Sequence, residues 1–229
     1  MEGPTTVSAI LHSSTMVKAG VYLVLRIYPI IVASPTTMQF IAYVGSFTAF
    51  IAATMALVEW DIKRILAYST ISQIGYMMSA LGVGGFAVGY LHLISHAFFK
   101  ALLFLCAGSV VHVMHEVIHD TWLSRDMRYM GGLLKPMKIT AWTMLIGGLA
   151  LAGIFPLSGF WSKDAVIEAA FEAGDPIVYW LLVITALLTS FYIMRLWFNT
   201  FLGELRAPKL LKEHSSKEHD IHLHESPLV

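Results

Sequence analysis

Residues 86–113 read FAVGYLHLISHAFFKALLFLCAGSVVHV, an apolar run interrupted near its middle by His92, His96 and Lys100. The spacing of four residues places these three ionisable side chains on one face of a helix. The run is long enough to cross a bilayer, which requires about 20 mostly apolar residues. Ionisable groups at that depth usually mark a transport path, so the segment predicts a membrane protein that moves protons or other cations.

The composition of the chain supports a membrane class. Hydrophobic residues make up 57% of the 229 positions and charged residues only 13%, whereas soluble domains carry about 25% charged residues. The formal net charge of +0 argues against a nucleic-acid partner, because phosphate binding requires a basic excess. The single cysteine, Cys106, lies inside an apolar run and offers neither a disulfide nor a cysteine-based metal or iron–sulfur site.

Six segments have the length and apolar character of membrane-spanning helices. We therefore predict an all-α membrane protein with about six transmembrane helices, one of them discontinuous. The expected spans are residues 7–32, 38–58, 62–83, 86–113, 137–171 and 177–202.

Basic residues gather in alternate connections between these spans. The first and third connections have none, and the fifth is acidic, with Glu168, Glu172 and Asp175. This is the positive-inside pattern, and it predicts that both chain ends are cytoplasmic in a multi-pass protein of a prokaryotic cytoplasmic membrane. The basic residues concerned are Lys63, Arg64, Arg125, Arg128, Lys135, Lys138, Arg206, Lys209 and Lys212.

The fifth span contains a built-in break. Its residues 153–159 read GIFPLSG, and Pro156 removes a backbone donor between flanking glycines. A second half-helix would begin near Lys163 and Asp164, and the ends of half-helices inside a membrane are typical of transporter sites. We expect Lys163 to lie beside the positive dipole end of that half-helix. A simple proline kink, with Lys163 snorkelling to the interface, is the alternative.

The first span also contains ionisable residues. His12 and Lys18 are six residues apart and therefore lie on different helical faces. For His12, a core histidine satisfied by a backbone carbonyl and a member of a proton relay remain open interpretations. Arg26, near the far end, is expected to anchor the span at the interface.

Two other stretches of the chain are rich in histidine. Residues 115–119 match the H-E-x-x-H zinc-protease pattern, in which two histidines bind zinc and Glu116 activates water. The only asparagine, Asn199, lacks the surroundings of a third-ligand motif, so an intramembrane zinc metalloprotease is a remote alternative. The tail at 206–229 is predicted to be a polar, His-rich cytoplasmic loop or tail.

Several longer motifs resemble those of the antiporter-like proton-pumping subunits of respiratory complex I. The likeness is greatest to the subunit called L, or chain 5 of NADH dehydrogenase, and it extends in order over residues 1–205. Related families are Mrp-type cation/proton antiporters, membrane-bound hydrogenases and archaeal dehydrogenases. The motifs are EGPTTVSA (2–9), HSSTMVKAG (12–20), DIKRILAYSTISQIGY (61–76), HLISHAFFKALLF (92–104), MGGL (130–133) and GFWSKD (159–164).

The resemblance implies an architecture and a set of site residues. Residues 1–205 would form a partial proton-translocating membrane domain, with one five-helix repeat at about 38–203 and one extra helix. The chain would then be a fragment, because the buried Glu and Lys of the family's first repeat correspond to sequence upstream of Met1. The implied relay has Lys100 at its centre, His92 and His96 as links, Lys163 at the exit and His12 between half-channels, with Lys18 and Asp164 as further candidates.

The resemblance also implies a function. The chain would be a proton-translocating subunit of a complex I-type quinone oxidoreductase that takes electrons from NADH or a related donor. It would hold no redox centre itself, and NADH, FMN, iron–sulfur clusters and quinone would bind in other subunits. The expected partners are other membrane subunits, the lipid bilayer and protons, with no nucleic acid. An Mrp-type antiporter or a membrane-bound hydrogenase subunit is the alternative.

Overall fold

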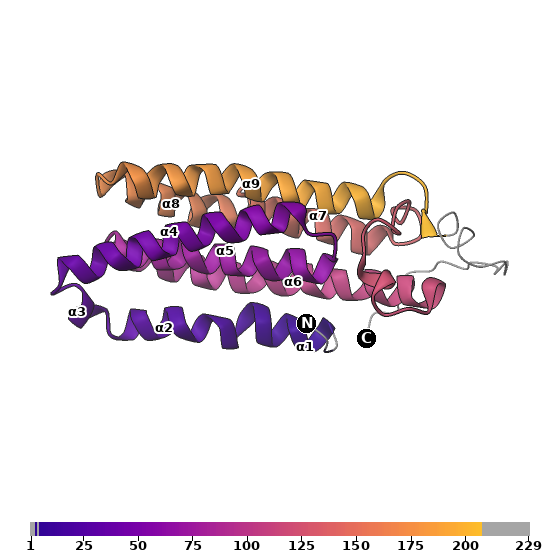
Figure 1. Ribbon diagram of the computed structural model, residues 1–229, viewed down its shortest axis with the longest axis horizontal. Helices are drawn as coiled ribbons and strands as arrows, with labels where there is room; N and C mark the ends of the chain where they lie inside the picture. Colours follow the sequence, from indigo (N-terminus) through magenta and orange to yellow (C-terminus); the bar gives the residue numbers. More distant parts are fainter. Residues whose placement is uncertain (1–2, 4, 208–229) are drawn as a thin grey trace.

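The computed structural model describes residue 3 and residues 5–207, and this part of the chain is an elongated helical bundle without named strands (Figure 1). The long helices α4, α5, α6 and α9 run along the bundle, while α7 and α8 follow one another in a single line. The elements are α1 (Thr5–Ser8), η1 (Ala9–Ser14), η2 (Met16–Lys18), α2 (Ala19–Arg26), α3 (Tyr28–Ile31), α4 (Pro35–Val58), α5 (Ile62–Gly82), α6 (Phe86–Ile118), η3 (Leu123–Arg125), α7 (Lys138–Ala152), α8 (Ser158–Glu172) and α9 (Pro176–Phe201).

Four stretches among the described residues are long and apolar enough to cross a membrane: Thr5–Arg26, α4, α6 and α9. The α7 helix is apolar but shorter, and with α8 it forms the discontinuous span. The α5 helix has 21 residues and carries many of its polar side chains on buried positions. The predicted all-α membrane fold with one broken helix is therefore confirmed.

The first span differs from the continuous helix expected at 7–32. A π-helical turn, η1, is followed by the 3₁₀ turn η2, and a further interruption at Ile27 separates α2 from α3. Thr15 explains the first irregularity, since both its backbone N–H and its hydroxyl donate to the carbonyl of Ile10, at 3.1 and 3.0 Å. This bond spans five residues, the repeat of a π-turn rather than of an α-helix.

The α4 and α5 helices pack closely through small residues. A Cβ atom added to Gly75 would lie 2.6 Å from the backbone nitrogen of Ala49. The hydroxyls of Ser72 and Ser79 donate to the carbonyls of Ala49 and Ala42, at 2.9 and 3.1 Å. Small residues and interhelical hydroxyl bonds are how membrane helices approach closely. This contact fixes α5 against α4, while α6 and α8 also pack against α5.

The two ends of the bundle differ in charge. The connections that follow α4, α6 and α9 meet at one end (Figure 1), and that end contains Lys63, Arg64, Arg125 and Arg128. The opposite end contains the last residue of α8, Glu172, and the connection to α9, in which Asp175 caps α9. The basic and acidic connections that alternate along the sequence therefore lie at opposite ends of the bundle.

A cation–aromatic cluster ties the basic end together. The guanidinium groups of Arg195 and Arg128 lie 5.1 and 5.5 Å from the ring centre of Trp60. Arg195 also donates to the backbone carbonyl of Glu59. Arg128 is paired with Asp126, whose hydrogen bond raises the pKa of the guanidinium further. Helix α9 is therefore joined to the α4–α5 connection and to the segment after α6.

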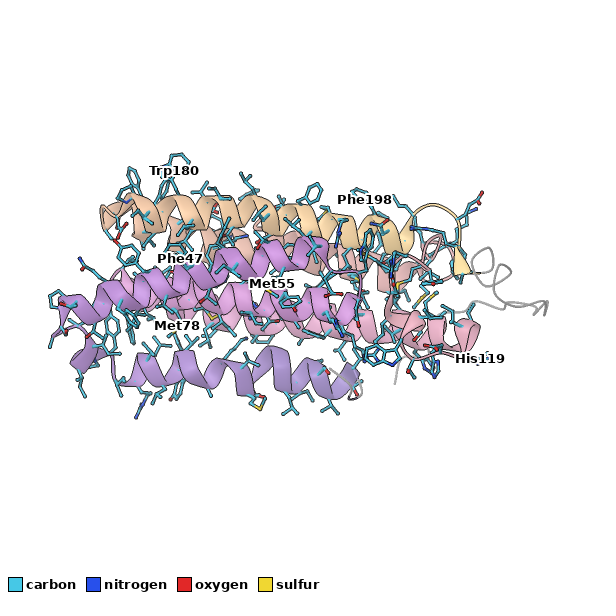
Figure 2. The ribbon with its side chains drawn as sticks, viewed as in Figure 1. Phe47, Met55, Met78, His119, Trp180 and Phe198 are labelled. Atoms are coloured by element: carbon cyan, nitrogen blue, oxygen red, sulfur yellow. The ribbon has the colours of Figure 1, made fainter. Side chains whose placement is uncertain are left out.

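The outer surface of the bundle is apolar. In Figure 2, Phe47, Met55, Trp180 and Phe198 project outwards from the helices, and all four side chains are exposed. Many large apolar side chains are exposed in this way, which is unusual for a soluble monomer and expected where lipid or a partner protein surrounds the helices.

Candidate functional site

The ionisable stripe of α6 lies in the interior of the bundle. The side chains of His92, His96 and Lys100 are 1%, 0% and 0% exposed. Helix α6 is packed against α5, α7, α8 and η1, so neighbours surround this face. The four-residue spacing thus places all three side chains together, as a helix requires.

Lys100 is held by groups from α5. Its Nζ donates to the carbonyl oxygen of Leu66 at 3.1 Å and to Oγ of Ser69 at 2.7 Å. The hydroxyl of Tyr192, on α9, donates to the same Ser69 oxygen at 2.7 Å. Lys100 has no ion pair within the described part of the chain, so its ammonium protons meet only neutral acceptors. The three helices α5, α6 and α9 share this polar node.

His92 joins α6 to both α5 and α8. Its Nδ1 lies 2.9 Å from the hydroxyl of Ser162, and its Nε2 lies 3.0 Å from Oε1 of Gln73. Ser162 directly precedes Lys163 in the chain. The imidazole therefore connects the polar face of α5 to the helix that carries the second buried lysine.

His96 has a contrasting environment. Its ring packs on the edge of Phe99 at 5.3 Å and lies 6.1 Å from the ring of His92. Over residues 5–207, neither of its ring nitrogens has a hydrogen-bond partner, and the same is true of Nε2 of Gln73. Unpaired buried polar atoms cost about 1–3 kcal/mol each, so they are uncommon and often belong to a functional site.

Lys163 points into the bundle beside the helix break. Its side chain is 1% exposed, and its Nζ donates to the carbonyl of Leu151 at 3.5 Å and lies 5.4 Å from the ring centre of Tyr76. The snorkelling alternative is therefore wrong. The sequence predicted that Lys163 would lie beside the positive dipole end of α8. Its amine instead bonds the carbonyl of Leu151, which belongs to the last turn of α7, where the helix dipole is negative.

The break itself is closely packed. Gly153 ends α7 with a φ of 86°, a conformation that favours glycine. Gly159, in the first turn of α8, has no room for a side chain, because an added Cβ would overlap the carbonyl oxygen of Ala150. The two half-helices thus approach one another through a glycine, which brings Lys163 to the end of α7.

The structure places the candidates of the first span unequally. Lys18 ends η2 with only 3% of its side chain exposed, and its Nζ donates to the carbonyl of Leu93 at 3.1 Å. It therefore reaches α6 one residue after His92. The backbone of His12 lies in η1, but its side chain is outside the described residues.

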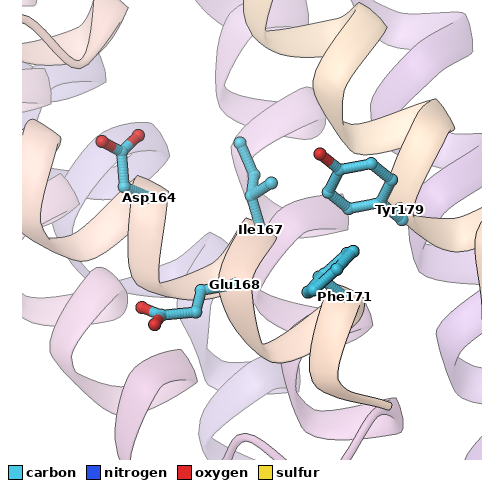
Figure 3. Close-up of a pocket in the computed structure, with 5 residues that line it drawn as sticks. All are labelled: Asp164, Ile167, Glu168, Phe171 and Tyr179. Carbon is cyan, nitrogen blue, oxygen red and sulfur yellow. The ribbon is translucent and has the colours of Figure 1, made fainter. Parts of the chain in front are cut away.

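Asp164 does not join the buried groups. Its side chain lies in an open hollow of about 350 Å³ between α8 and α9. Figure 3 shows Asp164 and Glu168 on α8, with the ring of Tyr179 approaching from α9. Asp164 follows Lys163 in sequence but is exposed on another face of α8, since consecutive residues lie on different faces of a helix, and its charge still acts on the Lys163 amine.

The H-E-x-x-H stretch straddles the end of α6. Helix α6 ends at Ile118, and His119 adopts a left-handed conformation with φ 55°. The backbone N–H of His119 closes the last turn on the carbonyl of His115, but His119 itself leaves the helical conformation, and Glu116 pairs with His112 at 3.5 Å. No group of three or more potential metal ligands was found among the residues that the structure describes. The tail at 208–229 lies outside those residues.

Sequence reasoning missed the polar partners of the stripe. Ser69, Gln73 and Tyr76 are spaced by four and three residues in α5, which is a helical face, and this spacing was a usable signal. Ser162 could have been suspected from its position before Lys163. Tyr192 carried no local signal, since only the packing of α9 brings it to Ser69.

The fold and the site together define a class of protein. A helical membrane bundle with a broken helix and buried lysines at the break and in the neighbouring helix is typical of transporter-like membrane proteins. A sequence profile described as "NADH:quinone oxidoreductase/Mrp antiporter, TM" matches residues 1–189. The chain belongs to this family, and it is an integral membrane protein.

Known relatives agree with this assignment. NAD(P)H-quinone oxidoreductase chain 5 of Picosynechococcus sp. is 51% identical over 240 residues, covering 100% of this chain and 36% of the relative. F(420)H(2) dehydrogenase subunit L of Methanosarcina mazei is 48% identical over 245 residues, covering 100% of this chain and 34% of the relative. The chain thus spans about a third of the length of these relatives.

Two solved assemblies contain a similar fold. A chain of the Mrp complex from Dietzia sp. matches with a TM-score of 0.79 and 29% identity, over 88% of this chain and 37% of that one. A chain of the membrane-bound sulfane sulfur reductase, an archaeal respiratory membrane complex, matches with a TM-score of 0.82 and 29% identity, over 99% of this chain and 37% of that one.

Proposed function

We propose that this chain is part of a proton-translocating membrane subunit of a complex I-type oxidoreductase, in which electrons pass from NADH or a related donor to quinone. The observation that carries the proposal is the row of buried ionisable side chains on one face of α6, flanked by two hydrogen-bonded groups. One group joins Lys100 to Ser69 and Tyr192, and the other joins His92 to Gln73 and to Ser162, the residue before Lys163. The names of the relatives, chain 5 and subunit L of quinone-linked or F(420)H(2) dehydrogenases, support the choice of complex.

In this proposal, protons move through the bundle while electrons move elsewhere. Lys100, His92, His96 and Lys163 hold and release protons in turn, and a redox step in other subunits changes the electrostatic field at one end of the line. NADH, FMN, iron–sulfur clusters and quinone would bind in those other subunits. The bilayer and neighbouring membrane subunits would surround the apolar surface.

Further parts of the proposal concern organisation. Residues 38–203, which correspond to α4 to α9, would form one five-helix repeat with α7 and α8 as its broken member. The basic end of the bundle would face the cytoplasm of a prokaryotic cell, as the positive-inside rule predicts. Lys18 and His12 would connect this repeat to a preceding half-channel, and Asp164 would lie on the exit side in the hollow shown in Figure 3.

The test uses the native complex in inside-out vesicles. Lys100→Ala should lower proton uptake per electron transferred by about tenfold or more, as loss of a proton-transfer group does in enzymes. Proton uptake is followed with a pH-sensitive dye, and electron transfer by oxidation of the donor. Lys138→Ala, which removes an exposed lysine at the start of α7, is the matched control. Unchanged uptake in Lys100→Ala would refute the proposed role.

An Mrp-type cation/proton antiporter is the second candidate, favoured by the TM-score of 0.79 to a chain of the Mrp complex. The two functions differ in what drives the protons. An antiporter should exchange protons for sodium in vesicles without any redox substrate, whereas the oxidoreductase subunit should take up protons only while the donor is oxidised.

A further inference from the structure

The imidazole of His92 is bracketed by two side chains of different hydrogen-bonding capacity. Gln73 presents a carbonyl oxygen at 3.0 Å, and a carbonyl oxygen only accepts. Nε2 of His92 must therefore carry the proton in this arrangement. Nδ1 is then the acceptor, and the hydroxyl of Ser162 donates to it at 2.9 Å. The two neighbours together fix one neutral tautomer of the ring.

The two neighbours also differ in what they can pass on. A hydroxyl both donates and accepts, so Ser162 can take part in a proton chain. The amide oxygen of Gln73 accepts a hydrogen bond but is far too weak a base to take the proton itself. The route through His92 is therefore open towards α8 and closed at α5.

The amide of Gln73 is held by few bonds. Its Oε1 contacts His92, but its buried Nε2 has no partner among the described residues. Rotation of the amide away from His92 therefore breaks a single hydrogen bond, and none anchors its amino group. Rotation by 180° would instead place an N–H donor against Nε2, which reverses both bonds of the ring and moves its proton to Nδ1.

We propose that Gln73 is a positioning residue that gates proton transfer through His92, an inference that rests on the proposed function. With the amide in place, a proton that enters at Nδ1 from the Ser162 side forms an imidazolium that can only return it. When the amide rotates, the Nε2 proton passes to a water molecule on the His96 side, and the ring is again neutral. One proton enters the ring and one leaves it.

Ionisable side chains of α5, α8 and η2, and of α6 itself, surround the ring. His92 faces Tyr76 on α5, His96 on its own helix, Lys163 on α8 and Lys18 on η2. A change in the charge of either lysine alters the field at the imidazole, so the rotation of Gln73 can follow the state of the relay. Gln73 itself is neutral and carries no proton, so its role is to position the ring, whereas the two lysines change the electric field around it.

The experiment replaces Gln73 in the native complex. Gln73→Glu preserves shape but supplies a carboxylate that can take the Nε2 proton, so passive proton leak through vesicles without donor should rise by about tenfold. Gln73→Leu removes the bond but supplies no base, so leak should stay low while the pH profile of donor-driven uptake shifts by about one unit. If both variants keep the wild-type leak and pH profile, the gating role is refuted.

A second pair of variants distinguishes a specific effect on His92 from a general effect on folding. Ser162→Ala removes the hydroxyl that faces Nδ1, whereas Ser79→Ala removes an equally buried hydroxyl that bonds Ala42 and does not contact His92. We expect a changed pH profile only in Ser162→Ala, and equal profiles would overturn the inference.

Lys100→Ala separates the two proposals: if it abolishes uptake while the Gln73 and Ser162 variants behave like wild type, the gate fails and the relay stands. If it leaves uptake unchanged, the relay itself fails.

Discussion

Helix α6 and the residue that follows it carry two pairs of histidines with the same spacing and opposite surroundings. His92 and His96 lie in the first third of the helix, where both side chains are buried. His115 lies in its last turn, and His119 follows the end of the helix in a left-handed conformation. Figure 2 shows His119 at the tip of the bundle, beyond the apolar surface.

The comparison teaches that spacing alone does not define a site. A separation of four residues predicts a shared face only while the helix continues. Around His92, neighbouring helices supply Gln73 and Ser162, so the imidazole becomes part of a network. At the end, Glu116 takes His112 as its partner on an exposed surface, where an ion pair stabilises little.

The largest expected difference follows from replacing each pair. His92→Ala with His96→Ala should lower proton uptake per electron by about tenfold or more, because both proton-binding groups between the lysines are lost. His115→Ala with His119→Ala should leave it within about twofold. Uptake by vesicles during donor oxidation measures both. Equal losses would show that the buried pair has no special role.

A smaller effect is expected at the Lys100 node. Ser69→Ala removes the acceptor that Lys100 and Tyr192 share. Lys100 keeps its bond to the carbonyl of Leu66, and the loss of two buried hydrogen bonds should lower the free energy of unfolding by about 1–3 kcal/mol. Tyr192→Phe removes one donor together with its hydroxyl, so no polar atom of residue 192 is left unpaired. The free energy of unfolding should therefore fall by only about 1 kcal/mol. Thermal unfolding in detergent compares the two variants. A larger loss in Tyr192→Phe would contradict this account of the node.

The sequence predicted the helices well because hydropathy is a local property. The length of apolar runs located the spans, and Pro156 with its flanking glycines located the break between α7 and α8. The first span, predicted at 7–32, is present as Thr5–Arg26, but its π- and 3₁₀-turns were not predicted, because the bonds of Thr15 to Ile10 change the helical repeat without any change in hydropathy.

The site was predictable only in part, for a physical reason. Helical periodicity places His92, His96 and Lys100 on one face, but their partners come from other helices whose rotation and depth depend on packing. Ser69 and Tyr192 meet across 123 positions of sequence. Lys163 was expected at the positive end of α8, yet its long side chain reaches back to the carbonyl end of α7. Such choices depend on side-chain direction, which residue spacing does not specify.

At the end of α6, removal of the exposed pair should change little. Glu116→Gln replaces the partner of His112, and an exposed pair contributes at most about 0.5 kcal/mol to stability. Proton uptake should remain within about twofold of wild type, and a zinc chelator should have no effect on it, because His119 leaves the helical conformation that the zinc-binding pattern requires. Loss of uptake on chelation, restored by zinc, would reopen the metal interpretation of this segment.

The smallest effect concerns Asp120, directly after His119. Hydrogen bonds from the backbone N–H groups of Leu123 and Trp122 lower the pKa of this carboxyl below its ordinary value. Because the folded-state pKa is lowered, the stabilisation is present above the ordinary aspartate pKa of about 3.9 and is lost as the pH falls through the folded value. Asp120→Asn keeps an acceptor oxygen but no charge, so its unfolding temperature should lie slightly below that of the wild type at pH 7. The gap should close as the medium is acidified below pH 4, and a gap that widened instead would show that these bonds do not favour the ionised carboxyl.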